Sequence, residues 1–122
     1  MKRAILLVDH GSRRAEANAL LDDVADQVRE RTPESIVEIA HLEIAEPDIA
    51  EGIDACVKKG ATQIIVHPFF LGPGRHTSQD IPAQVAQAAR RHSNIQIRIS
   101  EPLGGHGALI GVILDRVSDA DR

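Results

Sequence analysis

The chain has 122 residues, a net charge of −4 at pH 7 and a pI near 5.8, enough for one domain (1–122) with an ordinary core. This acidic balance gives no reason to expect nucleic acid or an anionic membrane as partner, and two Phe with no Trp or Tyr leave few rings to stack on bases. Cys56 is the single cysteine, which excludes an internal disulfide and favours a reducing cytoplasm.

Strand-like and helix-like runs alternate about every 30 residues, which is typical of βα units. The first apolar run, residues 4–8, is too short for a signal sequence or a membrane span, so we expect a soluble protein. Further strands are predicted at 36–40, 64–66 and 95–99, and helices at 15–31, from Pro47 to Gly60, after Asp80, and over 109–117 as a closing helix. Right-handed crossovers then predict a three-layer α/β sandwich with a four-stranded parallel sheet flanked by helices.

The longest loop, residues 68–82, follows the third predicted strand and contains two glycines and three prolines. Loops at the carboxyl ends of parallel strands are where α/β proteins place ligand chemistry. This loop carries a cation and an imidazole side by side, Arg75 and His76. It is therefore the first candidate for a functional site.

Three chemically capable side chains each follow a different predicted strand: His10, Glu43 and His76. Because parallel strands end at the same edge of the sheet, we expect these side chains to converge there. Two imidazoles and a carboxylate suit a borderline divalent metal. The nearby cations Arg13, Arg14 and Arg75, together with the starts of two helices, suit a polyanionic ligand.

Each of these residues also has a plainer interpretation. A single histidine after a strand is more often a loop residue than a ligand, and Glu43 alone could be an exposed edge residue. Asp80 is most simply a helix cap, and Cys56 lies on an apolar helix face and is assigned to the core. Three histidines are assigned structural or surface positions: His67, His92 and His106. His41 is left ambiguous, because it lies two residues before Glu43.

Four segments together resemble the sirohydrochlorin chelatases of the CbiX and SirB type, in order and over nearly the whole chain. They are Asp9-His10-Gly11-Ser12-Arg13, Leu42-Glu43-Ile44-Ala45-Glu46-Pro47, Pro68-Phe69-Phe70-Leu71 with Gly74-Arg75-His76 and Asp80-Ile81-Pro82, and Pro102-Leu103-Gly104. The resemblance implies a lyase-class enzyme that inserts cobalt, iron or nickel into the tetrapyrrole sirohydrochlorin, in cobalamin or siroheme biosynthesis. The metal is a substrate, and no organic cofactor is implied.

The resemblance also implies roles for individual residues. His10 and His76 are the implied metal-binding and catalytic histidines, assisted by Glu43, and we place Arg13, Arg75 and Ser12 where the tetrapyrrole binds. It further implies one half of the two-half class II chelatase fold. Short members pair as homodimers, so the expected partners are sirohydrochlorin and a second copy.

Other functions stay open at this point. A metal or tetrapyrrole carrier would keep the same ligands without turnover. His10-Gly11 after a strand is similar to part of the Arg-His-Gly motif of histidine phosphatases and mutases, although Asp9 replaces the arginine and would repel a phosphoryl group. A Ser12 nucleophile lacks the surrounding nucleophile-elbow pattern. A half subunit that needs a different partner chain is a further alternative.

Overall fold

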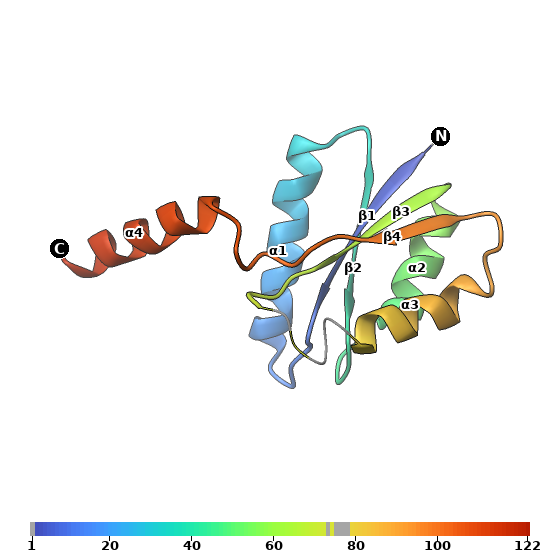
Figure 1. Ribbon diagram of the computed structural model, residues 1–122, viewed down its shortest axis with the longest axis horizontal. Coiled ribbons are helices and arrows are strands. Elements are labelled where there is room, and N and C mark those ends of the chain that lie inside the picture. Colours follow the sequence, from blue (N-terminus) through green and yellow to red (C-terminus); the bar gives the residue numbers. More distant parts are fainter. Residues whose placement is uncertain (1, 73, 75–78) are drawn as a thin grey trace.

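The computed structural model describes residues 2–72, 74 and 79–122. Strands and helices alternate along the chain (Figure 1): β1 Arg3–Asp9, α1 Ala15–Arg31, β2 Ile36–His41, α2 Ile49–Lys58, β3 Gln63–Pro68, α3 Ile81–Ala89, β4 Gln96–Ile99 and α4 Ala108–Ala120. All four strands are parallel, in the order β2-β1-β3-β4. The predicted parallel sheet is confirmed.

The sheet lies between two helical layers of unequal size. α2 and α3 cover one face, where the larger apolar cluster includes Leu6, Ile53 and Ile64. α1 covers β1 and β2 on the other face through Leu21 and Ala25. The three-layer sandwich is therefore confirmed, and most residues of β1, an interior strand of the sheet, are buried.

Local sequence accounts for most of the helix boundaries. α2 begins with a capping box, because the Asp48 side chain accepts from the Glu51 backbone N–H and the Glu51 side chain accepts from that of Asp48. The prediction that Pro47 opens this helix is wrong by two residues, since the cap comes after the proline. Gly60 follows the end of α2 with φ of +100°, a conformation that favours glycine. Asp80 stands at the N-cap position of α3, but its side chain makes no capping hydrogen bond.

The last helix departs from the expected closing role. Figure 1 shows α4 projecting from the body of the fold beyond α1, and none of its residues is buried. Its apolar stripe is 55–61% exposed and consists of Ile110, Ile113, Leu114 and Val117. The helix itself was predicted, but its apolar face covers no part of the sheet.

The residues assigned to structural positions behave as expected. Cys56 is fully buried in the core, and burial raises the pKa of its thiol to about 12. His67 pairs with the Ser100 hydroxyl at 2.8 Å, and burial lowers the pKa of its imidazole. His92 lies 2.7 Å from the Asp54 carboxylate, and the His106 ring accepts from the Ala108 backbone N–H. Among the helices that the structure describes, none is long and apolar enough to cross a membrane.

Candidate functional site

Two of the three predicted site residues meet at the carboxyl edge of the sheet. His10 follows β1 and Glu43 follows β2, and the ring Nε2 of His10 lies 2.6 Å from Oε1 of Glu43. Their side chains are 46% and 52% exposed, respectively. An imidazole and a carboxylate in direct contact and open to solvent can bind a metal or pass a proton between them.

The backbone explains why the two side chains meet. Hydrogen bonds between β1 and β2 continue past the strand ends, with the N–H of Leu42 donating to the carbonyl of Asp9 and that of Glu43 to the carbonyl of His10. Gly11 permits this approach, because it has φ of +94° and an added Cβ would lie 1.9 Å from the Glu43 carbonyl oxygen. The glycine in the Asp9-His10-Gly11 motif is thus a requirement of close packing.

A hollow of about 400 Å³ opens beside His10. Its walls come from the ends of β1 and β3 and from the first turn of α1, and they include Asp9, His10, Gly11, Ser12, Ala17, Asn18 and Phe69 to Leu71. The hollow therefore combines an apolar wall from the loop after β3 with the polar His10 side.

The Pro102-Leu103-Gly104 segment shapes that apolar wall. The N–H groups of Leu103 and Gly104 both donate to the Phe70 carbonyl. A Cβ on Gly104 would lie 1.2 Å from the Leu71 carbonyl oxygen, so only glycine fits there. This motif near the C-terminus thus acts on the site through the position of Phe70 and Leu71.

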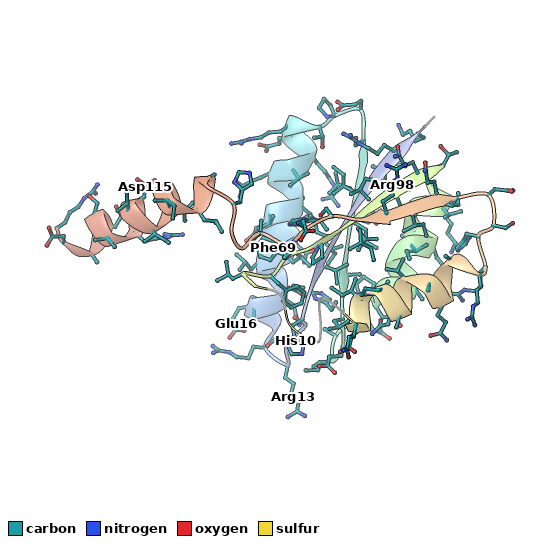
Figure 2. All side chains as sticks on the ribbon, in the orientation of Figure 1. His10, Arg13, Glu16, Phe69, Arg98 and Asp115 are labelled. Carbon is teal, nitrogen blue, oxygen red and sulfur yellow. The ribbon has the colours of Figure 1, made fainter. Side chains whose placement is uncertain are left out.

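The loop residues around His10 have distinct positions. Ser12 lines the hollow, its backbone N–H donates to the Asn18 side chain, and its hydroxyl accepts from the Arg14 N–H. Arg13 is exposed and extends outward from the body of the fold in Figure 2. Arg14 pairs with Glu16 and is also exposed.

Arg75 and His76, the other cation and histidine predicted for the site, lie outside the described residues. The structure therefore brings together His10 and Glu43 and does not test the position of His76. Within 2–72, 74 and 79–122, no three His, Cys, Asp or Glu side chains are grouped so that they could hold a metal ion.

Sequence reasoning missed one pair next to the site. Nδ1 of His41 lies 2.5 Å from Oδ1 of Asp9, and His41 is 1% exposed. These are the last paired residues of β1 and β2. The position of each at a strand end was visible in the sequence, but the neighbouring order of the two strands, which brings them together, was not.

Comparisons with known proteins agree on one family. The CbiX family model matches residues 4–120. The sirohydrochlorin ferrochelatase of Arabidopsis thaliana chloroplasts is 47% identical over 93% of this chain and 50% of its own length. A sirohydrochlorin cobaltochelatase of Methanocaldococcus jannaschii is 31% identical over 93% of this chain and 96% of its own length.

Solved structures give the same result. The sirohydrochlorin chelatase SirB from Bacillus subtilis subspecies spizizenii, in complex with cobalt, matches with a TM-score of 0.91 and 37% identity over 98% of this chain and 51% of its own. A cobalamin biosynthesis CbiX protein from Marinobacter aquaeolei, so described with the qualifier "putative", matches with a TM-score of 0.83 and 30% identity. The match covers 97% of this chain and 96% of that protein.

The matched proteins fall into two groups by their own length. This chain spans about half of the Arabidopsis and Bacillus proteins but nearly all of the archaeal and Marinobacter ones. In both groups the match covers 93–98% of this chain. Because the family model extends over 4–120 and includes the His10 and Glu43 segments, this chain belongs to the CbiX family.

Proposed function

We propose that this chain inserts a divalent metal, cobalt or iron, into sirohydrochlorin and so acts as a lyase-class sirohydrochlorin chelatase. The observation that carries the proposal is the exposed contact between His10 and Glu43, 2.6 Å apart beside an open hollow, in a chain of the CbiX family. The names of the relatives, ferrochelatase and cobaltochelatase, supply the substrate class.

The reaction requires a base and an acceptor for protons. Sirohydrochlorin loses two pyrrole protons as the metal binds its four nitrogens, and the metal sheds water. A neutral imidazole can take a pyrrole proton, and the Glu43 carboxylate at 2.6 Å stabilises the imidazolium that results and can relay the proton to solvent. With Nε2–H of His10 donated to Glu43, the basic lone pair of the ring is on Nδ1.

The remaining predicted residues have supporting roles in this proposal. His76 is the second histidine that takes a proton or holds the incoming metal with His10. Arg13, Arg75 and Ser12 bind carboxylates around the rim of the macrocycle, for which a guanidinium is well suited. The apolar wall at Phe69 and Phe70 would lie against the flat face of the tetrapyrrole.

The proposal includes a homodimer. The hollow is open on one side, and an apolar stripe on α4 with a helical repeat of three and four residues is exposed. A second copy is the occupant that suits this stripe, because relatives of nearly the same length match over their whole chains. The domain spanning 1–122 then forms one half of the two-half cleft, in the cytoplasm.

Light scattering tests the assembly directly. The wild-type chain should have the mass of two copies at tens of micromolar, and Leu114→Glu should shift it to one copy without loss of helical signal. Asp119→Glu, on the same helix, is the matched control and should stay dimeric. A monomeric wild type would contradict the homodimer.

The activity test is an insertion assay with sirohydrochlorin and cobalt, iron or nickel, followed by visible absorbance. A chelatase accelerates metal insertion over the rate in buffer, and the preferred metal separates a cobalamin role from a siroheme role. A carrier would bind metal and macrocycle without accelerating their union. The latter result would overturn the enzymatic proposal.

A further inference from the structure

A buried imidazole, His41, lies at the strand ends from which the segments of the proposed reacting pair continue. His41 is 1% exposed and is the one charged or polar side chain in the buried core of the described residues. Its Nδ1 lies 2.5 Å from Oδ1 of Asp9, whose side chain is 20% exposed. The carboxylate accepts the Nδ1–H, which fixes the plane of the ring.

The pair occupies the last rung of the β1–β2 ladder. Asp9 and His41 are register partners, and the next residues along each strand lead to His10 and Glu43. Beyond this rung two backbone hydrogen bonds link the segments, from the N–H of Leu42 to the Asp9 carbonyl at 2.8 Å and from that of Glu43 to the His10 carbonyl at 3.1 Å. The Asp9–His41 contact therefore adds a side-chain link to these backbone bonds at the point where the His10 and Glu43 segments leave the sheet.

His41 also anchors the loop that carries Glu43. Its backbone N–H donates to the Pro47 carbonyl at 2.8 Å, which closes the loop at its base. Within that loop Ile44 has φ of +73°, a conformation that is unfavourable for a β-branched residue. Such a conformation persists only where the surrounding contacts determine it, and the backbone hydrogen bond of His41 to Pro47, which the variants below keep, closes the loop that contains it.

Stability alone does not account for a buried polar pair at this position. Replacing a buried ion pair by apolar groups of similar volume is often neutral or stabilising. His41 is 1% exposed, and Val37 and Ile39, which alternate with it on the same face of β2, belong to the apolar cluster on that side, so an apolar ring would suit the burial. The directional hydrogen bond is what a phenylalanine would lack.

We propose that Asp9 and His41 form a positioning pair that holds Glu43 against His10 for proton transfer and metal insertion. The role at the reaction rests on the proposed function, whereas the geometric claim does not. Neither residue needs to touch the macrocycle or the metal. The pair acts by holding the carboxylate and the imidazole at one separation.

The test compares variants with and without a donor at position 41. His41→Phe keeps a flat aromatic ring, somewhat larger than imidazole, and loses the donor, and His41→Asn keeps an N–H near the Nδ1 position. His92→Phe is the matched control, because His92 forms the same kind of contact with Asp54 at 2.7 Å, away from the site. Asp9→Ala, which removes the acceptor and leaves His41 in place, serves if His41→Phe does not fold.

Two readouts separate positioning from general stability. Removing such a supporting hydrogen bond should lower kcat by about 10–100-fold and leave KM for sirohydrochlorin within about twofold. The imidazole nitrogen shifts of His10, measured by NMR without metal, should move in His41→Phe toward those of Glu43→Gln. His41→Asn should restore most of both, and His92→Phe should change neither.

The outcomes have clear consequences. Folded His41→Phe with wild-type kcat and wild-type His10 shifts would overturn the proposal, and so would a loss in His41→Asn as large as in His41→Phe. If the wild type shows no turnover, the proposed function fails, and the NMR comparison still decides whether the pair positions His10 and Glu43.

Discussion

Gly11→Ala should damage both the fold and the site, because Gly11 lies where two backbones touch. An added Cβ would come within 1.9 Å of the Glu43 carbonyl oxygen, so that oxygen must move away by at least about 1.5 Å to reach ordinary contact. The φ of +94° adds about 1–2 kcal/mol for a residue with a side chain. Overpacking at a rigid position adds about 1–3 kcal/mol.

The matched control is Gly60→Ala. Gly60 has φ of +100°, nearly the same as Gly11, but a Cβ there would meet nothing within 4 Å. It should cost only the conformational term of about 1–2 kcal/mol, whereas Gly11→Ala should cost about 2–5 kcal/mol in total. The difference between the two variants measures the contact with Glu43.

Urea unfolding followed by circular dichroism gives these free energies, since the chain has no Trp or Tyr for fluorescence. Metal-insertion rates, measured without urea under conditions in which both variants are folded, give the effect of each substitution on activity. Gly11→Ala should lose insertion by displacing Glu43 from His10, and Gly60→Ala should keep the wild-type rate. Equal stability losses and equal rates for the two variants would refute the close-packing argument.

Three further predictions concern the rest of the fold. Burial raises the pKa of Cys56 to about 12, so the thiol should resist maleimide at pH 8 until the chain unfolds, and rapid labelling of folded protein would contradict its burial. Burial lowers the pKa of His67, so the unfolded chain takes up that proton first as pH falls below about 6.5. Stability should thus decline on acidification, and less steeply in His67→Gln; parallel declines would exclude this contribution. Asp48→Ala removes the side-chain acceptor at the start of α2 and should cost about 1 kcal/mol in urea unfolding, whereas an unchanged midpoint would mean that the capping box contributes nothing.

Hydrophobic periodicity predicted the four strands and four helices because burial on a parallel sheet leaves continuous apolar runs such as residues 4–8. The meeting of His10 and Glu43 followed from the shared edge of a parallel sheet. The contact of Asp9 with His41 was not predicted, because it depends on the exact register that pairs these two strand ends, and register between β1 and β2 has no local signal. The start of α2 was misplaced because Asp48 and Pro47 are both plausible first residues of a helix, and the capping box decided between them.

The position of α4 shows another limit of prediction from sequence patterns. Its apolar stripe, centred on Ile113 and Leu114, predicted a buried face but not the surface that buries it. Periodicity predicts that one face of the helix is apolar, but it does not identify the surface that covers that face. In the structure α4 projects from the fold and none of its residues is buried (Figure 1).

The most direct test of the proposed reacting pair is the insertion rate of His10→Ala beside that of the wild type, with sirohydrochlorin and cobalt at neutral pH. Removing a general base and ligand should lower the rate by about 100-fold or more, while circular dichroism stays native because His10 is half exposed in a loop. His92→Ala, at the remote contact with Asp54, should keep the wild-type rate. A folded His10→Ala that inserts cobalt at the wild-type rate would contradict the assignment of His10 and Glu43 as the reacting pair.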